Sequence, residues 1–186
     1  MQVSRGAFRG LKLNTLAGSQ TRPTTQKVKE AIFNMLAAKI ADSVVLDVFS
    51  GSGALGIECL SMGAKQVYFN DSSKQACQII KSNVIKLPAG NYQLFNLDYH
   101  DLFALMTKKK IQFDLIILDP PYHLHIIAQL INLIMVNNLL NKNGIIVVES
   151  SHKESAEIAG LGLKIIKDKK YGQTRILVYQ YLEKEE

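Results

Sequence analysis

Hydrophobic residues follow two different spacings along the chain. Short runs rich in Val, Ile, Leu and Phe end in turn residues at 43–50, 65–71, 92–98, 113–119 and 144–150. Between these runs, apolar residues recur every three or four positions at 53–63, 73–87, 101–110 and 125–140. The first pattern is typical of buried strands and the second of amphipathic helices. Strands that alternate with helices predict parallel βαβ units in a three-layer α/β domain.

The two ends of the chain depart from this alternation. Residues 1–20 alternate weakly and contain three glycines, which predicts a small hairpin followed by a loop. A helix is expected next, reaching Ile40 and capped by Thr24 or Thr25. Near the other end, 162–170 and 174–182 read as an antiparallel pair of strands joined by a tight turn.

Composition narrows the class of protein only slightly. The 186 residues suit one domain, 47% of them are hydrophobic, and the net charge of +6 is compatible with a polyanionic partner without requiring one. Cys59 and Cys77 lie among apolar residues, which favours buried, reduced thiols in a cytoplasmic protein and predicts no metal cluster. The opening MQVSRGAFRG lacks an apolar core, so no signal peptide is expected.

A glycine-rich turn follows the first predicted strand. Gly51, Gly53 and Gly56 match the dinucleotide fingerprint, and Asp71 could accept hydrogen bonds from ribose hydroxyls, so an NAD-binding domain is a serious alternative. Asp47 argues against it, because a carboxylate just before the glycines would repel a pyrophosphate. S-adenosylmethionine (SAM) carries a sulfonium and an amino group instead, and the pattern therefore favours SAM.

Four acids share one position in the predicted fold. Each of them ends a strand expected to be parallel: Asp47, Asp71, Asp98 and Asp119. The carboxyl ends of such strands form the ligand crevice of an open α/β sheet, so the four acids are expected at one edge. Asp98 stands where it could hold an adenine amino group.

The fourth acid opens the run Asp119-Pro120-Pro121-Tyr122. Two prolines make this turn unusually rigid. An exocyclic amine of a base is a weak nucleophile, and the carboxylate of Asp119 with the carbonyl of Pro120 can accept its N–H bonds and orient its lone pair. Tyr122 offers a ring on which a flipped base can stack. His123 and His125 have no third ligand and read as surface residues.

These features together resemble those of the bacterial 16S rRNA guanine-N2 methyltransferases of the RsmD type. The resemblance covers essentially the whole chain. It rests on RGAFRGLKL, TRPTTQKVKEAIFNML, LDVFSGSGALGIE, DPPY and YGQTRILVY. It implies a seven-stranded, Rossmann-like SAM methyltransferase domain over 41–186, with the hairpin and helix of 1–40 packed on it.

The resemblance also implies roles for individual residues. Asp47, Gly51 and Gly53 would cradle the methionine part of SAM, Asp71 would hold the ribose and Asp98 the adenine, with Ser50 and Tyr99 in the same cofactor-binding set. Residues 119–122 would hold the target guanine of small-subunit rRNA, within a partly or fully assembled subunit. One departure is that Ser72 and Ser73 follow Asp71 where the family usually has a second acid.

The N-terminal segment carries an excess of bases. Before Asp42 the single acid is Glu30, and the bases are Arg5, Arg9, Lys12, Arg22, Lys27, Lys29 and Lys39. They predict a basic surface that meets RNA phosphates, with a merely solvated face as the alternative. Tyr171 and Arg175 either flank the target pocket or serve a hairpin turn.

Three other functions remain open from the sequence. An adenine-N6 methyltransferase acting on DNA or RNA would use the same active-site geometry. A glutamine-N5 methyltransferase acting on protein usually has Asn in the place of Asp119. A non-catalytic RNA-binding module could keep the fold, but the intact Asp47, glycines and DPPY run argue against it.

Overall fold

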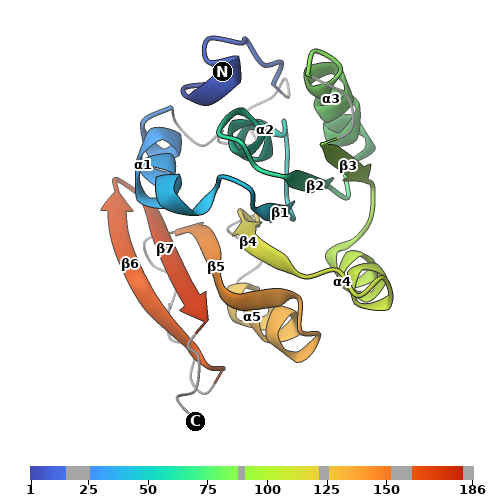
Figure 1. Cartoon of the computed structure of the whole chain (residues 1–186), viewed down its shortest axis with the longest axis vertical. Helices are drawn as coiled ribbons and strands as arrows, with labels where there is room; N and C mark the ends of the chain where they lie inside the picture. Colours follow the sequence, from blue (N-terminus) through green and yellow to red (C-terminus); the bar gives the residue numbers. More distant parts are fainter. Residues whose placement is uncertain (16–25, 88–90, 122–125, 152–160, 182–186) are drawn as a thin grey trace.

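Seven strands form one mixed sheet in the computed structural model, which describes residues 1–15, 26–87, 91–121, 126–151 and 161–181. They are β1 (Val44–Asp47), β2 (Gln66–Asn70), β3 (Tyr92–Phe95), β4 (Phe113–Leu118), β5 (Leu140–Ser151), β6 (Leu163–Tyr171) and β7 (Thr174–Tyr181). Their order is β3-β2-β1-β4-β5-β7-β6 (Figure 1). Pairs from β3 to β5 are parallel, whereas β7 is antiparallel to β5 and β6. The predicted α/β fold with an antiparallel terminal pair is confirmed.

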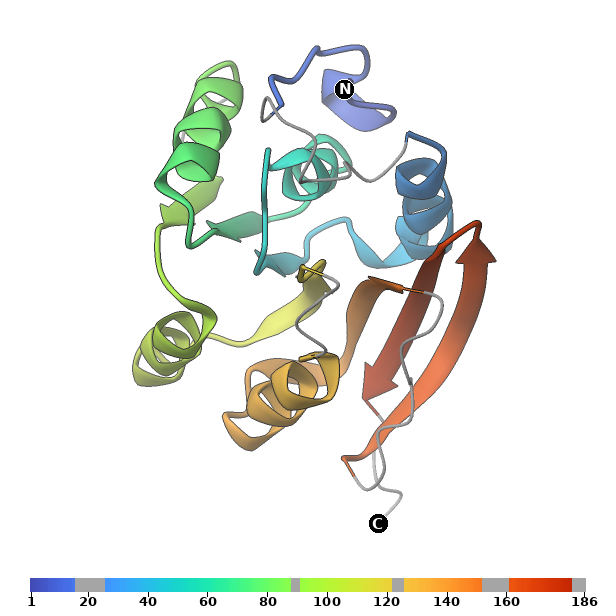
Figure 2. The same cartoon turned by 180° about the vertical axis from the view of Figure 1, so that it is seen from behind.

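Helices cover both faces of this sheet, as Figures 1 and 2 show from opposite sides. One face packs against α1 (Gln26–Leu36), α2 (Ala54–Ser61) and α3 (Lys74–Val84), and the other against α4 (Tyr99–Lys108) and α5 (Ile127–Val136). The central strands are apolar throughout because successive side chains enter different cores, as Val45 and Leu46 do in β1. None of the described helices is both long and apolar enough to cross a membrane.

The boundary between α5 and β5 differs from the sequence prediction. The helix expected over 125–140 ends at Val136, and β5 begins at Leu140 rather than at Gly144. Asn138 has a φ of 52°, a left-handed conformation that ends the helix and that Asn tolerates better than most residues. Leu140 then pairs with Phe113 of β4, so an apolar residue that continued the helical spacing in fact starts a strand.

Residues 1–13 fold back on themselves, but the predicted hairpin is reduced to a single bridge between Gln2 and Lys12. A short 3-10 helix, η1 (Gly6–Phe8), occupies the turn. Gly6 has a φ of +73°, and a Cβ there would lie 1.7 Å from the carbonyl oxygen of Ser61 at the end of α2. The extension therefore approaches α2 so closely that only glycine fits.

A buried ion pair attaches this extension to the rest of the domain. The Nζ of Lys29 in α1 lies 2.6 Å from Oε2 of Glu58 in α2, and both side chains are fully buried. The carboxylate of Glu58 also accepts the backbone N–H groups of Ser4 and Arg5, and Lys29 donates to the carbonyl of Gln2. Placing Lys29 on a basic outer surface was therefore wrong, because its ammonium group bonds inside the protein.

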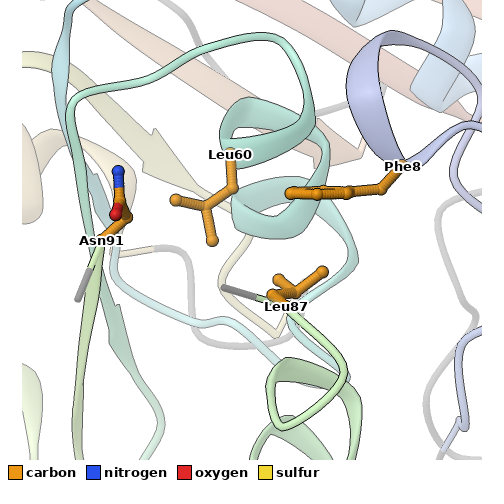
Figure 3. Close-up of a pocket in the computed structure, with 4 residues that line it drawn as sticks. All are labelled: Phe8, Leu60, Leu87 and Asn91. Carbon is orange, nitrogen blue, oxygen red and sulfur yellow. The ribbon is translucent and has the colours of Figure 1, made fainter. Parts of the chain in front are cut away.

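A small cavity lies where the extension meets the ends of two helices. Phe8, Leu60, Leu87 and Asn91 line it, and their side chains converge in Figure 3. Leu60 belongs to the last turn of α2, and Asn91 immediately precedes β3. The cavity is thus at the amino ends of the strands, on the opposite edge from the four acids, and it is not the site that they form.

We predict that Lys29→Met lowers the free energy of unfolding by about 3 kcal/mol, because Glu58 would keep a buried charge without its counterion. Urea denaturation measures this loss. The double variant Lys29→Met, Glu58→Gln should be more stable than Lys29→Met alone, since the buried charge is gone. A loss below about 1 kcal/mol in the single variant, the range of exposed ion pairs, would contradict the prediction.

Candidate active site

The sheet brings the four predicted acids to one edge. Strands β3, β2, β1 and β4 are neighbours, all parallel, and the acids stand at or just after their carboxyl ends. Asp47 is the last residue of β1, Asp71 directly follows β2, Asp119 directly follows β4, and Asp98 comes three residues after β3. Asp47 pairs in register with Ile117 of the adjacent strand β4, and Asp119 comes two residues after Ile117.

The glycine turn between β1 and α2 needs glycine for two different reasons. Gly51 and Gly53 have φ values of +55° and +77°, which strain any other residue. Gly56 stands in the first turn of α2, where a Cβ would lie 2.3 Å from the ring of Phe69 in β2. A Cβ on Gly51 would meet no atom within 4 Å, so the turn leaves open space on that side.

Asp71 joins the glycine turn to the start of α3. Its Oδ2 accepts the N–H of Gly51 at 2.8 Å, and its Oδ1 accepts the N–H of Ser73 at 2.9 Å. Ser73 in turn caps α3 by accepting the N–H of Ala76. Each carboxylate oxygen has two lone pairs, so Asp71 keeps capacity to bind a ligand while it holds these two segments.

Asp47 is turned inward. It is 1% exposed, and its Oδ2 accepts the N–H of Gly56 at 3.1 Å. Burial raises the pKa of its carboxyl from 3.8 to about 7, and the nearby charge of Asp71 adds to the rise while the Gly56 N–H opposes it. In this structure, Asp47 therefore links the end of β1 to the first turn of α2 from inside the glycine turn.

A network of hydrogen bonds around Asn70, the last residue of β2, holds the loops that follow β1 and β3 at this edge. The buried Nδ2 of Asn70 donates to the carbonyls of Val48 and Leu97, and its Oδ1 accepts the N–H of Leu97. Ser50 donates through Oγ to the carbonyl of Asp47 and accepts the N–H of Asn70. Sequence reasoning included Ser50 but missed Asn70, although a polar residue at the end of an otherwise apolar strand was a usable signal.

Asp98 and Tyr99 begin α4. Asp98 is exposed and caps the helix, its Oδ1 accepting the N–H of His100 at 2.8 Å. The ring of Tyr99 lies 6.1 Å from that of Phe49 in the glycine turn, centroid to centroid. The glycine turn and the start of α4 thus contribute one ring each to an aromatic pair, and Phe49 is another residue that sequence reasoning did not select.

The predicted methyl-transfer motif lies next to the glycine turn. Asp119 is half-buried, Pro120 is buried and Pro121 is exposed. A backbone hydrogen bond joins the two segments, because the N–H of Val48, which follows β1, donates to the carbonyl of Ile117 in β4. Tyr122, His123 and His125 lie outside the described residues.

The residues proposed for RNA contact fall into two places. Arg9 and Lys27 are exposed on the extension and on α1, whereas the guanidinium of the half-buried Arg5 donates to Asn34 of α1. Arg175 forms a bidentate pair with Asp168 across β6 and β7, and Tyr171 is half-buried. Arg22 lies outside the described residues. Figures 1 and 2 show the β6–β7 turn beside α1, the helix that carries Lys27.

No metal centre is visible in the part of the chain that the structure describes, since no three His, Cys, Asp or Glu residues come together there. The residues described at this edge offer carboxylates, backbone carbonyls and aromatic rings. These groups suit the binding of a polar organic cofactor and of an amine.

The sheet order and the acids at its carboxyl edge define the class of Rossmann-like methyltransferase folds. The chain belongs to the family described as Conserved hypothetical protein 95, whose model matches residues 1–180. "Ribosomal RNA small subunit methyltransferase D" of Haemophilus influenzae is 35% identical, over 97% of this chain and 93% of its own length. The resemblance stated from the sequence is confirmed.

Solved structures agree with this assignment. The structure of yhhF from Escherichia coli superposes with a TM-score of 0.87 at 31% identity, over 98% of both chains. The more distant SMU.776, complexed with SAH, has a TM-score of 0.69 at 18% identity and is matched over 82% of this chain and 49% of its own. The second likeness shows the fold alone.

We predict that Asp47→Asn stabilises the protein increasingly as the pH rises. The folded carboxyl, with its pKa raised to about 7, holds its proton between about pH 4 and 7 while the unfolded one ionises, so the wild type loses stability across that window. Asparagine keeps an oxygen for the Gly56 N–H without a charge. Calorimetry should show a gain of roughly 2–4 kcal/mol at pH 8 and a smaller gain at pH 4.5. Equal differences at both values would contradict the raised pKa.

Proposed function

We propose that this chain is a SAM-dependent methyltransferase that modifies the exocyclic N2 amine of a guanine in small-subunit rRNA. One observation carries the chemistry: Asp119 and Pro120 follow β4 directly, beside the glycine turn that follows β1. The name of the Haemophilus influenzae relative, methyltransferase D of small-subunit rRNA, supports the choice of substrate.

The residues at the edge fit SAM better than a dinucleotide. The segment 47–53 carries no cationic side chain, and the carboxylate of Asp71 bonds to its Gly51, which suits a sulfonium and an amino group and disfavours a pyrophosphate. Asp71 keeps lone pairs for ribose hydroxyls, and Asp98 with Tyr99 stands where the adenine would lie. Gly51 leaves open space, while Asp47, Ser50 and Gly53 hold the turn in shape. Bound SAM supplies a methyl group on a cationic sulfur.

The protein's own groups act on the amine. The carboxylate of Asp119 and the carbonyl of Pro120 each accept one N–H of the target nitrogen, so its lone pair is directed away from both acceptors. As the nitrogen gains positive charge, the nearby carboxylate stabilises it. Proline at 120 and 121 removes two N–H donors and limits the motion of this turn, which keeps the acceptors in position. Tyr122 is proposed to stack on the base.

The identity of the methylated nucleoside tests this proposal. The protein is incubated with SAM carrying a tritiated methyl group and with small subunits, free 16S rRNA, DNA or protein, and the labelled product is digested and separated by mass. Label is expected on the N2 of a guanine of rRNA. Label on adenine N6 or on a glutamine side chain would contradict the proposed substrate and leave the methyltransferase class in place.

We predict that Asp119→Ala abolishes methyl transfer, by a factor of 10² or more, while the dissociation constant for S-adenosylhomocysteine (SAH) stays within about threefold. The lost acceptor touches the amine and not the cofactor. Single-turnover rates and calorimetric titration measure the two quantities. Asp42→Asn, which removes an exposed carboxylate just before β1, at the opposite end of that strand from the glycine turn, is the control. Turnover near that of the wild type would rule out the role of Asp119.

We predict that Arg9→Glu combined with Lys27→Glu weakens RNA binding and flattens its dependence on salt. The loss of two phosphate contacts should reduce the slope of the logarithm of the RNA association constant against the logarithm of the salt concentration by about 2. Filter binding between 50 and 200 mM salt measures it. The pair Lys108→Glu, Lys109→Glu at the end of α4 is a charge-matched control. A slope equal to that of the control would favour a merely solvated basic face.

A further inference from the structure

The side chain of Asn83 joins two segments that are far apart in the sequence. It stands in α3, fully buried, and its Nδ2 donates to the carbonyl of Asn14 at 3.0 Å and to that of Ser52 at 2.9 Å. Its Oδ1 accepts the N–H of Asn14 at 2.8 Å. Two donors and one acceptor of a single amide are thus used, on the N-terminal extension and on the glycine turn.

The bond to the glycine turn falls at a sensitive place. Ser52 stands between Gly51 and Gly53, which both have positive φ, so the peptide groups around it are held in a conformation that is costly for the chain to keep by itself. Asp71 fixes the N–H of Gly51 on one side of Ser52, and Asn83 fixes the carbonyl of Ser52. Without the second bond, the peptide group between Ser52 and Gly53 loses this anchor, whereas Ser50 and Gly51 keep theirs.

The bond to the extension is of a different kind. Asn83 contacts the backbone of Asn14 and not its side chain, which instead donates to Ser82. Any residue except proline at position 14 can therefore keep the N–H bond. The docking of residues 1–14 and the geometry of the glycine turn consequently share one buried amide.

We propose that Asn83 is a positioning residue for the cofactor-binding turn, and that it makes cofactor affinity depend on the docking of the N-terminal extension. This inference rests on the proposed function in one respect, that the glycine turn holds SAM. The extension need not touch the cofactor. Because linkage is reciprocal, whatever binds the docked extension and the cofactor will each strengthen the binding of the other.

Calorimetric titration of the full-length protein with SAH tests both parts of the proposal. Asn83→Asp keeps the size of the side chain and its acceptor but loses both donated bonds, and we expect the dissociation constant to rise about tenfold, equivalent to about 1.4 kcal/mol. Asn14→Pro removes the N–H that Asn83 accepts and should raise it about threefold. The methyl-transfer rate at saturating SAM should stay within about twofold of wild type in Asn83→Asp, since no acceptor of the amine is touched.

Matched variants separate positioning from simple loss of stability. Asn14→Ala keeps both backbone groups, and Ile134→Val destabilises the buried face of α5 far from the turn, so both should bind SAH as the wild type does. Binding by Asn83→Asp within twofold of wild type would overturn the role of Asn83, and unchanged binding by Asn14→Pro would overturn the coupling. A similar loss in Ile134→Val would also overturn it.

Asp71→Asn tells this failure apart from failure of the proposed function. If Asp71→Asn loses SAH and Asn83→Asp does not, the cofactor site stands and the inference about Asn83 falls. If neither variant affects SAH binding, the glycine turn is not the cofactor site, and the inference falls with that assignment.

Discussion

The buried carboxylate of Glu58 is the contact on which the arrangement of the extension depends. It neutralises Lys29 of α1 and accepts two backbone N–H groups of the N-terminal segment, all from one position in α2. The same helix begins at the glycine turn, where Gly53 precedes its first residue. A displacement of the extension would therefore disturb the proposed cofactor site by two routes, through Glu58 in α2 and through Asn83, which bonds to Ser52 in the glycine turn.

The four acids at the carboxyl edge of the sheet differ in how deeply they are buried. Asp47, at 1% exposure, bonds to Gly56 and holds the shape of the turn. Asp71 holds two N–H groups and retains lone pairs, and the exposed Asp98 spends one oxygen on a helix cap. Asp119 directly follows β4, on the other side of β1 from β2 and β3, and the turn that it begins is stiffened by proline. The edge thus separates residues that shape the cofactor site from the residue proposed to meet the amine.

The position of this edge could be predicted from the sequence because the apolar periodicity is local and the strands are parallel. The glycines with positive φ and the acids at strand ends could be recognised because each closely follows an apolar run. Lys29 could not be placed in this way, since the adjacent Glu30 and the nearby Lys27 suggest an exposed helix face and its partner is 29 residues away. Asn83 gave a weak signal as a polar residue three positions after Ile80, on the buried face of α3. What such a residue contacts depends on tertiary packing.

In the proposed function, the choice of substrate base depends on a different part of the molecule than the methyl transfer does. Acceptors such as Asp119 and Pro120 can orient any exocyclic amine, so they do not by themselves distinguish guanine from adenine. Discrimination requires contacts to the rest of the base and to the surrounding RNA. The β6–β7 turn lies beside α1, which carries the exposed Lys27, and both elements are outside the four strands that carry the acids (Figures 1 and 2). Placing RNA contacts there would let substrate choice change without disturbing the network around Asn70 and Asp71.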